Sequence, residues 1–490
     1  MKKAVLCILM SLLLTAFASC AKENVETPSA ASNNSETAEY VDTAETETEK
    51  EILSDGLGNL DFGGATFAMY TPDPEVMNWA NPVLNVSEQT GDILSDAIYD
   101  RNRSLEERLN VIITENYGSW DIGASYLRTL VSSGDSTYAV VSMLDRFALA
   151  SLGEKLITPY DEIEYIDLTK PYWGGELLSY SSIGGRNYFA FGDFSLYAYD
   201  NISALLCNRQ LLTDNGLEDV YTLVKEKKWT IDKFTEYAET VLKDADGNGI
   251  MDENDTWGYL SMPKQVLPTM WISGGELSVA KDENDLPYLN MTNESFVNVF
   301  TKTFEAIRDT GIWYENTIQS DTDMTLENMF IDSQALFLDS TFHKIQRLRD
   351  MDSDFGIIPY PMEDETQDAY YSRTSGALFT TIPVTSTTKD MTGAVLEAMA
   401  CASRNEIIPT YYEITLKSKY SRDTDSSEML DIIFSNRVYD LGDSLWCDQI
   451  RDNFVKEMFQ SNDRDISSEL KSRQKLITKI IDKDVSALSN

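Results

Sequence analysis

The sequence predicts an α/β protein with at least two lobes, and three observations support this prediction. A chain of 490 residues is longer than one ordinary hydrophobic core requires. Between residues 66 and 144 the hydrophobic pattern changes repeatedly between a period of two and the helical period, in the order β-α-β-α-β. Strands and helices that alternate at this spacing favour a parallel sheet with right-handed crossovers. We therefore expect an open parallel sheet early in the chain and a second lobe after it.

The N-terminus has the pattern of a secretion signal. Two lysines precede the apolar run from Ala4 to Leu14, which is too short to span a membrane and is followed by small residues. The junction at residues 17–20 (Phe-Ala-Ser-Cys) resembles the lipobox of bacterial lipoproteins, although Phe17 stands where that motif usually has an aliphatic residue. The resemblance implies that residues 1–19 are removed and that Cys20 carries a lipid. The alternative is a plain signal peptide beside an incidental cysteine.

Residues 20–60 are predicted to form an acidic, disordered tether. The stretch from Ala21 to about Asp55 consists mostly of Glu, Thr, Ser, Ala and Asn, with almost no large apolar side chains. Such a segment cannot bury enough apolar surface to offset the entropy of ordering it. A coil of roughly 40 residues spans about 35 Å. We expect the tether to hold the folded part clear of a membrane surface.

Charge and the rare residue types exclude several classes of protein. With 81 acidic and 40 basic residues the net charge is -41, which argues against a nucleic-acid partner because phosphate would be repelled. The single histidine, His343, makes Ser-His-Asp catalysis and histidine-rich metal sites improbable. The cysteines that follow the signal region lack C-x-x-C spacing, so neither a zinc site nor a disulfide framework is expected.

Candidate ligand-binding residues follow from the predicted sheet. We expect strands at 66–70, 111–114 and 138–144, and helices at 93–109 and 124–131. Open parallel sheets bind ligands beyond the carboxyl ends of their strands. The residues after the three strands should therefore converge on one edge, and they include Tyr70, Trp79, Trp120, Asp145 and Arg146. The alternative for the last two is a helix N-cap with a solvated neighbour.

An aromatic stretch from Tyr188 to Asn208 gives further candidates. Alternation along residues 194–199 predicts a strand with one dry face and one face toward a cleft, where rings and polar groups suit a sugar. The candidates on this stretch are Asp193, Tyr197 and Tyr199. An aromatic core strand is the alternative.

The segment from Asp244 to Asp255 matches a calcium-binding loop. Oxygen donors occupy positions 1, 3, 5, 9 and 12, glycine stands at position 6, and the backbone carbonyl of position 7 completes the set: Asp244, Asp246, Asn248, Ile250, Asp252 and Asp255. The final Asp replaces the EF-hand glutamate, although dockerin-like loops also end in Asp. We expect a structural Ca²⁺ site; a metal-free acidic turn is the alternative.

The second half of the chain continues the α/β pattern. Thr230 is a natural N-cap for the helix that precedes the calcium-type loop. We expect strands at 257–260 and 354–361, a helix at 293–308, and mainly helix at 391–402 and 429–488. Trp271 is a candidate for stacking on a ligand, or else a core residue, and Arg373 is a candidate to reach the cleft.

Several segments resemble the extracellular solute-binding proteins of ABC sugar importers, the maltose-binding-protein superfamily. They are residues 144–160 (LDRFALASLGEKLITPY), the aromatic stretch followed by 208–219 (NRQLLTDNGLED), 229–238 (WTIDKFTEYA) and 375–389 (SGALFTTIPVTSTTK). The resemblance implies a periplasmic-binding-protein-like α/β fold, with two discontinuous lobes joined by crossover strands and a ligand cleft between them. It implies a first lobe of 61–190 plus 330–375 and a second of 191–329 plus 376–490. It also implies that Asp145 and Arg146 bind sugar hydroxyls and that Asp339 lies in the return crossing.

The expected function is that of an importer's receptor rather than an enzyme. We expect a monomeric protein, lipid-anchored through Cys20 at the extracellular face of the cytoplasmic membrane, that binds a sugar or oligosaccharide reversibly and delivers it to an ABC permease. The alternative is a secreted hydrolase, which would use two carboxylates about 5 to 9.5 Å apart. A calcium-dependent adhesion module is a third class, but the sequence contains no repeated loop that would favour it.

Overall fold

The structure of the protein is a computed structural model that describes residues 52–77, 79–318, 323–348, 351, 354–417 and 424–489. The predicted signal peptide, Cys20 and most of the predicted tether lie outside these residues. No described helix combines the length and the apolar composition that crossing a membrane requires.

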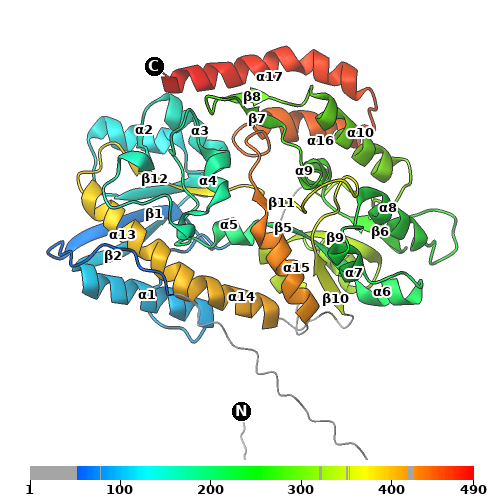
Figure 1. Ribbon diagram of the computed structural model, residues 1–490, viewed down its shortest axis with the longest axis horizontal. Helices are drawn as coiled ribbons and strands as arrows, with labels where there is room; N and C mark the ends of the chain where they lie inside the picture. The colour runs from blue at the N-terminus through cyan, green and yellow to red at the C-terminus, as the bar shows by residue number, and fades with distance from the viewer. Residues whose placement is uncertain are drawn as a thin grey trace, which may run out of the picture. The chain divides into compact units, whose positions relative to one another are not determined.

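The first lobe is built on a five-stranded sheet of order β2-β1-β3-β12-β4 (Figure 1). Its strands are β1 (Ala65–Pro72), β2 (Val111–Gly118), β3 (Val140–Leu144), β4 (Ile157–Thr158) and β12 (Leu378–Pro383). β1 pairs in parallel with both β2 and β3, whereas β12 runs antiparallel to β3 and β4. Helices α1 (Ile93–Leu109), α2 (Ala124–Ser133) and α3 (Asp145–Gly153) connect or follow the early strands. The predicted β-α-β-α-β order and its parallel pairing are confirmed.

The second lobe is built on a four-stranded sheet of order β10-β5-β9-β6. Its strands are β5 (Ser203–Asn208), β6 (Trp257–Leu260), β9 (Ala335–Thr341) and β10 (Phe355–Ile358). β9 lies antiparallel to β5 and parallel to β6.

Two predicted lobe boundaries are wrong. Residues 330–375 were expected in the first lobe, but β9 and β10 both belong to the second sheet. Residues 376–490 were expected in the second lobe, but β12 is inserted between β3 and β4 of the first. All of these strands are buried along their whole length or nearly so, and burial on both faces does not encode which sheet a strand joins.

The remaining elements surround and connect these sheets. The helices are α4 (Glu176–Ser181), α5 (Tyr197–Asp200), α6 (Arg209–Asp214), α7 (Val220–Lys225), α8 (Ile231–Thr240), α9 (Pro263–Ser273), α10 (Glu294–Arg308), α11 (Thr325–Ile331), α12 (Phe342–Ile345), α13 (Lys389–Ala402), α14 (Ile408–Lys417), α15 (Thr424–Ser435), the π-helical segment η5 (Asp448–Val455), α16 (Lys456–Gln460) and α17 (Ile466–Ser489). Two small sheets pair β7 (Val279–Lys281) with β8 (Pro287–Leu289), and β11 (Ser372–Arg373) with β13 (Arg437–Val438).

Helix capping explains where two of the predicted helices begin. The Thr230 hydroxyl accepts a hydrogen bond from the Lys233 amide at 3.3 Å and so caps α8, as predicted. Asn293 caps α10 through its contact with the Ser295 amide. Both helices bury an apolar face, and α8 ends just before the calcium-type loop.

The aromatic stretch is not the extended strand that the sequence predicts. Residues 188–196 form a loop that leads into the short helix α5, and the strand β5 begins only at Ser203. The chain turns at Gly192, whose carbonyl accepts the Ser195 amide at 3.1 Å, and a Cβ at Gly192 would lie 2.3 Å from the Phe194 ring. The rings consequently pack in several directions, and Phe189 stacks on Phe379 of β12 with centroids 4.1 Å apart. Period-two alternation of aromatics therefore does not mark a strand here.

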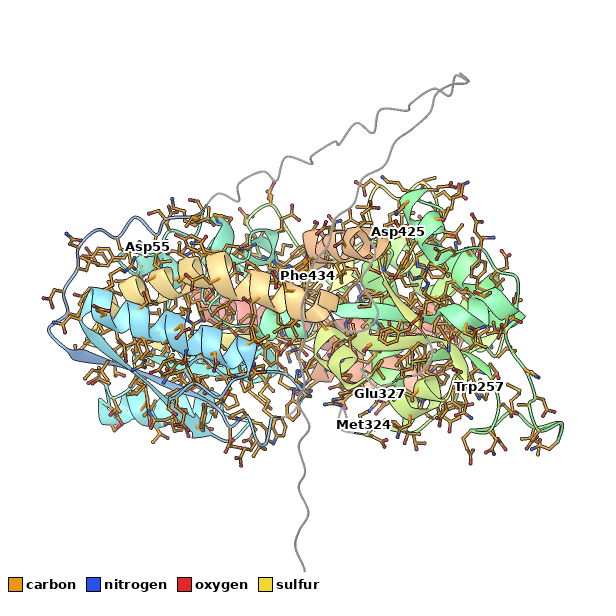
Figure 2. The ribbon with its side chains drawn as sticks, turned by 90° about the horizontal axis from the view of Figure 1, so that it is seen from below. Asp55, Trp257, Met324, Glu327, Asp425 and Phe434 are labelled. Atoms are coloured by element: carbon orange, nitrogen blue, oxygen red, sulfur yellow. The ribbon has the colours of Figure 1, made fainter. Side chains whose placement is uncertain are left out.

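Several elements join the two lobes. The chain crosses from the first sheet to the second through α5 and β5, and it returns from β11 to β12. Phe434 of α15, labelled in Figure 2, packs against Tyr199 on one crossing and Phe342 at the start of α12, at centroid distances of 5.8 and 4.6 Å. The long helix α17, red in Figure 1, contacts α3 of the first lobe and both α10 and β8 of the second. These contacts place the crossings and the C-terminal region beside the site described next.

Candidate functional site

A cavity of about 610 Å³ receives side chains from both lobes and from the C-terminal segment. This volume is within the range of small-molecule sites, roughly 300 to 1,000 Å³. We call this cavity the cleft; it is lined by Val76, Trp79, Trp120, Leu144, Asp145, Arg146, Tyr197, Asn201, Ser203, Met262, Lys264, Gln265, Asp339, Ser340, Thr341, Lys344, Ser375, Gly376, Asp443, Cys447 and Arg451. The ends of β3 and β9, the start of α9 and the segment before β12 meet there.

One wall of the cleft is aromatic. Trp79 and Trp120 follow β1 and β2, and their rings meet edge to face with centroids 6.0 Å apart. Phe147 supports Trp120 from behind at 5.7 Å, while Trp120 itself is 38% exposed. Tyr197 of α5 also lines the cavity. The expectation that residues after the first strands converge on one edge is confirmed for these tryptophans.

Asp145 and Arg146 stand at the start of α3, as the sheet argument predicted, and both line the cleft. The Asp145 carboxylate accepts bonds from the Ala377 amide at 2.8 Å, the Tyr439 hydroxyl at 2.9 Å and the Arg146 amide at 2.7 Å. Burial raises the pKa of Asp145. Asp145 therefore ties α3 to β12 and to the C-terminal segment as well as facing the cavity.

Ion pairs run from Arg146 along the base of the cleft. The Arg146 guanidinium contacts Asp448 and Asp452, the latter at 2.7 Å, and Arg451 also binds Asp452, at 2.8 Å. Arg451 then reaches Asp443 at 3.1 Å. This row of charges connects the first lobe to the η5 region of the chain.

The row continues into the second lobe through Arg373. Arg373 forms a buried ion pair with Asp443, and its Nη1 donates to the side-chain carbonyl of Gln265 on α9. Gln265 lines the cleft directly. Arg373 thus supports the cleft wall from behind.

Asp339 lies near the end of β9, on the second-lobe wall of the cleft. Its carboxylate accepts hydrogen bonds from the Tyr360 hydroxyl and, at 3.1 Å, from the Ser261 hydroxyl. Burial raises the pKa of Asp339. Asp339 lines the cleft, but the expectation that it lies in the return crossing is wrong, because β9 is an internal strand of the second sheet.

Five predicted residues do not line the cleft. Tyr70 faces α2, where it stacks on Tyr126 at 4.6 Å. Asp193 is 1% exposed and binds the Tyr199 hydroxyl and Arg404, so that Asp193 and Tyr199 belong to the packed interior. Their predicted exposure depended on an extended strand that is absent at residues 188–199.

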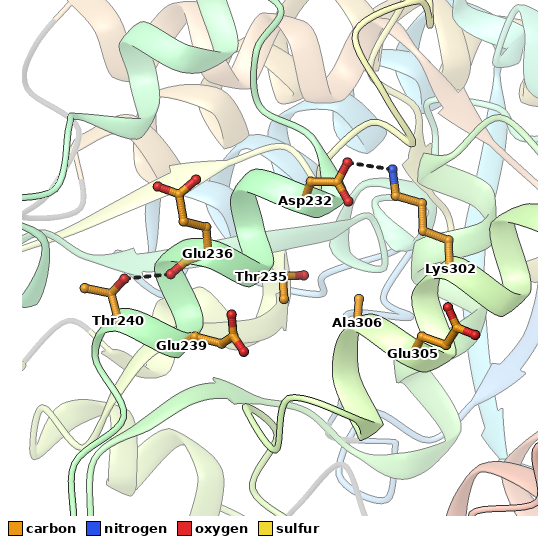
Figure 3. Close-up of a pocket in the computed structure, with 8 residues that line it drawn as sticks. All are labelled: Asp232, Thr235, Glu236, Glu239, Thr240, Lys302, Glu305 and Ala306. Carbon is orange, nitrogen blue, oxygen red and sulfur yellow. Dashed lines mark hydrogen bonds and ion pairs between the residues drawn. The ribbon is translucent and has the colours of Figure 1, made fainter.

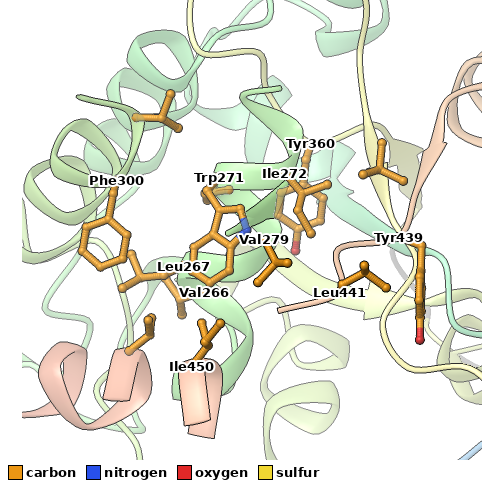
Figure 4. Close-up of a cluster of buried hydrophobic side chains, with 14 of the residues drawn as sticks. Val266, Leu267, Trp271, Ile272, Val279, Phe300, Tyr360, Tyr439, Leu441 and Ile450 are labelled. Atoms are coloured by element: carbon orange, nitrogen blue, oxygen red, sulfur yellow. The ribbon is translucent and has the colours of Figure 1, made fainter. Parts of the chain in front are cut away.

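Trp271 was a candidate for the cleft or for the core and Arg373 a candidate to reach the cleft, and both are buried. Trp271 is fully buried in α9, where it packs on Phe300 (Figure 4) and on Phe296. Its indole nitrogen donates to Asp440 at 3.0 Å. Arg373 is 1% exposed. Only the first turn of α9 meets the cavity, which leaves the rest of that helix inside the lobe.

Sequence reasoning missed the basic and amide side chains of the second-lobe wall. Lys264 and Gln265 lie in the first turn of α9, which begins at Pro263 shortly after β6 ends. Proline at the first helical position is a helix-start signal, and a strand followed closely by a helix start marks a sheet edge. Lys344 of α12 and Arg451 carried no comparable signal, because their positions depend on long-range packing.

A second cavity of about 560 Å³ is a groove between α8 and α10 (Figure 3). Its lining includes four carboxylates, and Lys302 pairs with one of them, Asp232, at 3.0 Å. The side chains are Asp232, Thr235, Glu236, Glu239, Thr240, Lys302, Glu305 and Ala306. Because this lining contains no aromatic ring, the groove suits a sugar less well than the cleft does.

The calcium-type loop contributes no residue to the lining of the cleft, and it joins α8 to β6. Side-chain oxygens of Asp244, Asp246 and Asp255 lie within 4.8 Å of one another. Gly249, at position 6, has φ of 83°, and its amide donates to Asp244 at 2.7 Å. Asp255 is fully buried, and its carboxylate accepts from the amides of Ala245 and Asp252. The glycine and the convergent oxygens fit the donor set that Ca²⁺ requires.

Comparison with known proteins gives the fold. No family model and no curated protein sequence matches the chain. The structure is similar to the sugar-binding protein MalE from Xanthomonas citri, with a TM-score of 0.60 and 11% identity over 86% of this chain and 98% of that one. It is similar to the cyclic alpha-maltosyl-1,6-maltose binding protein from Arthrobacter globiformis, with a TM-score of 0.57 and 11% identity over 86% and 99% of the two chains.

A third similar structure is UgpB from Mycobacterium tuberculosis in complex with glycerophosphocholine, with a TM-score of 0.55 and 14% identity over 86% of this chain and 99% of that one. These proteins share the architecture across nearly their whole lengths, while their identity to the chain is low. The chain therefore has the two-lobed α/β fold of the maltose-binding-protein-like solute-binding proteins.

Proposed function

We propose that the protein is the substrate-binding component of an ABC importer and that it binds a carbohydrate reversibly in the cleft. The single observation that carries this proposal is the cleft itself, where a tryptophan pair on one wall faces hydrogen-bonding groups from the other lobe. Aromatic faces pack on the C–H surfaces of a sugar ring, and charged or amide groups bind its polar substituents. Solved proteins of the same fold that bind sugars give further support.

Hinge closure is the motion that this arrangement favours. A ligand that contacts both lobes stabilises the conformation in which both walls reach it, and it shifts the population accordingly. The crossings at α5–β5 and β11–β12 are the segments that would bend. The resulting closed form is the one that we expect a membrane permease to receive.

The hydrolase alternative is less well supported than the receptor. It would need one carboxylate free to protonate the leaving group and another free to attack or activate water. The three carboxylates that line the cleft, Asp145, Asp339 and Asp443, are each engaged by at least two protein donors. Because protein donors hold all three carboxylates in place, the cleft favours reversible binding over hydrolysis.

A ligand screen with a turnover assay tests the proposed function. We expect a sugar or oligosaccharide to raise the melting temperature of the soluble chain, because binding to the native state stabilises it by mass action. The same incubations should release no reducing ends. Release of reducing ends would overturn the receptor assignment. Stabilisation only by solutes that are not carbohydrates would overturn the proposal that the ligand is a carbohydrate.

We also propose that Cys20 anchors the chain, as a monomer, at the extracellular face of the cytoplasmic membrane. The lipobox-like junction supports this localisation. Mass spectrometry of the membrane fraction should find a lipid-modified N-terminal cysteine, and Cys20→Ala should release the protein into the medium or periplasm. Equal membrane retention of the variant would contradict the anchor.

For the loop at residues 244–255 we propose a structural Ca²⁺ site. Asp244, Asp246 and Asp255 would supply carboxylate oxygens, and Ile250 its backbone carbonyl. An ion there would offset the repulsion among these acids and fix the connection between α8 and β6. The site lies in one lobe, so a structural role fits it better than control of the cleft.

A further inference from the structure

The loop that carries Trp79 has no regular secondary structure. Residues 79–92 contain neither helix nor strand, although Trp79 belongs to the aromatic wall of the cleft. The first lobe holds the middle of this loop, because Glu115 of β2 accepts the Leu84 amide at 3.1 Å and Arg101 of α1 donates to the Leu84 carbonyl at 2.6 Å. These contacts fix the loop beyond Trp79 and do not hold the part of the chain next to the tryptophan.

The contact next to Trp79 is with a buried carboxylate on the crossing between the lobes. The Asn81 amide donates to Oδ2 of Asp200 at 2.8 Å, and Asp200 is 1% exposed. Asp200 is the last residue of α5, and the first residue of that helix, Tyr197, lines the cleft. Within the described residues, this is the hydrogen bond closest to Trp79 in the sequence that joins the loop to another element. The tryptophan is thus tied to the crossing as well as to the first lobe.

The same carboxylate contacts two further elements. Oδ1 of Asp200 accepts the Tyr411 hydroxyl of α14 at 2.8 Å. Nδ1 of His343 in α12, which follows β9 of the second sheet, lies 3.6 Å from Oδ2. The next residue of α12, Lys344, lines the cleft. Asp200 therefore lies where the tryptophan loop, the crossing and the second-lobe wall meet.

The burial of Asp200 makes its contact with the loop costly to break. A buried carboxylate that loses a donor, or a buried amide that loses its acceptor, is left as an unpaired polar group away from water. The Asn81 amide and Asp200 should therefore stay together when the lobes move about the crossing. The loop that carries Trp79 would then follow α5 rather than the first-lobe sheet alone.

We propose that Asp200 is a positioning residue of the cleft: it holds the loop of Trp79 on the crossing helix α5 and so sets the orientation of the tryptophan wall toward a bound sugar. Asp200 does not itself line the cavity. The inference rests on the proposed function and adds a residue that acts on the same site through Trp79.

Substitution of Asp200 tests the proposal, with a matched control elsewhere in the first lobe. Asp200→Ala removes the acceptor of the Asn81 amide, whereas the side-chain carbonyl of Asp200→Asn can still accept it and should keep the loop in place. The control is Glu397 of α13, which is also fully buried and also accepts a backbone amide and a tyrosine hydroxyl, those of Asp167 and Tyr172. Glu397→Ala should destabilise the fold and leave the tryptophan wall unaltered, because Glu397 is not part of the cleft lining.

The first readout needs no ligand. In a chain labelled with fluorotryptophan, the fluorine NMR resonance of Trp79 is identified by its absence from Trp79→Phe. Asp200→Ala should shift and broaden that resonance, whereas Asp200→Asn and Glu397→Ala should leave it in the parent position. An unchanged Trp79 resonance in Asp200→Ala would overturn the proposal, and so would an equal shift in Glu397→Ala.

Hydrogen exchange of the parent chain keeps the proposal testable if Asp200→Ala does not fold. The Asn81 amide, bonded to a buried carboxylate, should be protected about a hundredfold more than the exposed Glu88 amide of the same loop, relative to the intrinsic exchange rate of each. NMR of the labelled amides measures both rates. Equal protection would show that Asp200 does not hold the loop, and it would overturn the proposal.

The second readout is affinity for a sugar. Maltotriose, cellotriose and mannotriose are titrated calorimetrically, and the one that the parent chain binds most tightly serves as the probe. Asp200→Ala should weaken its binding by about tenfold, and Asp200→Asn should restore most of the loss, because one polar contact changes affinity by about that factor. Unchanged affinity in Asp200→Ala would overturn the positioning role.

The two readouts separate this inference from the proposed function. Binding of none of the three sugars by the parent chain would count against the proposed function, while the fluorine spectra and the hydrogen exchange still decide whether Asp200 holds Trp79. Binding of a sugar with equal affinity by the parent chain and Asp200→Ala would leave the proposed function intact and overturn the inference alone.

Discussion

Arg373 and Asp443 form a bidentate ion pair in the interior of the protein, with Nε–Oδ2 and Nη2–Oδ1 distances of 2.6 and 2.9 Å. Both side chains are 1% exposed. Arg373 belongs to β11, just before the chain returns to the first lobe, and Asp443 belongs to the C-terminal segment. The pair therefore fixes two segments that are distant in the sequence behind the wall of the cleft.

Removing one partner of this pair should destabilise the fold strongly. Arg373→Met leaves the Asp443 carboxylate buried, with Arg451 as its remaining charged partner among the described residues. Breaking a buried pair typically costs about 3 to 5 kcal/mol of unfolding free energy. Urea denaturation measures the change. Arg128→Met is the control, because the Arg128–Glu154 pair is largely exposed and should contribute little. Similar losses of unfolding free energy in the two variants would show that burial does not determine how much the ion pair contributes to stability.

Stability in acid should depend on Asp452. Burial acts to raise the pKa of this carboxyl, but the guanidinium groups of Arg451 and Arg146 outweigh burial and lower it to about 2, from 3.8 in the unfolded chain. A depressed folded-state pKa contributes stability above about pH 4 that is lost as the pH falls to about 2. The shift corresponds to roughly 2 kcal/mol.

Asp452→Asn tests this pH dependence. Its free energy of unfolding should be lower than that of the parent chain at pH 7, and the difference should shrink as the pH approaches 2. Denaturation curves at a series of pH values measure this difference in unfolding free energy. The control is Asp214→Asn, which changes an exposed acid of α6. A difference that persists unchanged at pH 2 would show that the lost contact is not ionic.

Local pattern predicted the three parallel strands of the first sheet and part of the cleft. Strand and helix periods gave β1 to β3 in order, and the rule that parallel strands end at one edge then brought Trp79, Trp120, Asp145 and Arg146 to one cavity. These inferences need only the local chain and the handedness of crossovers.

The rest of the site depends on contacts that no local pattern encodes. The sheet that β9, β10 and β12 join is decided by tertiary packing, because strands of both sheets are buried and burial does not select a sheet. Residue type does not separate core from cleft either. Trp271 in α9 is a core residue and Trp120 in a loop is a cleft residue, and this difference follows from the fold. Lys344 and Arg451 reach the cleft through α12 and η5, whose positions depend on long-range packing.

Trp120 and Trp271 should give opposite results when each is replaced by alanine. Trp120 lines the cleft and is 38% exposed, so Trp120→Ala should weaken ligand binding by about tenfold while it changes the melting temperature little. Trp271 is fully buried, so Trp271→Ala should lower the free energy of unfolding by about 3 to 5 kcal/mol. Titration with the ligand and thermal unfolding of both variants measure the two effects. Destabilisation by Trp120→Ala comparable to that by Trp271→Ala would contradict the assignment of Trp120 to the cleft.

The calcium-type loop can be tested through a neighbouring tryptophan. The Trp257 indole donates a hydrogen bond to the backbone carbonyl of Asp252 at 2.8 Å, which places the ring against the loop. Tb³⁺, which replaces Ca²⁺ in oxygen-rich sites, should therefore show luminescence sensitised by Trp257, and Ca²⁺ should displace it. With an affinity of about 10⁻⁴ to 10⁻³ M, typical of extracellular modules, 10 mM Ca²⁺ should stabilise the fold by roughly 1 to 3 kcal/mol.

Two variants separate the metal from the reporter. Asp246→Ala removes an exposed carboxylate of the oxygen cluster and should abolish both the luminescence and the Ca²⁺-dependent stabilisation. Trp257→Phe should lose the luminescence but keep the stabilisation. Asp282→Ala, at another exposed turn whose carboxylate accepts the Leu286 amide, should change neither. If chelation of Ca²⁺ leaves the melting temperature of the parent chain unchanged, the loop is an acidic turn that holds no metal, and the buried Asp255 carboxylate orders it through the amides of Ala245 and Asp252 alone.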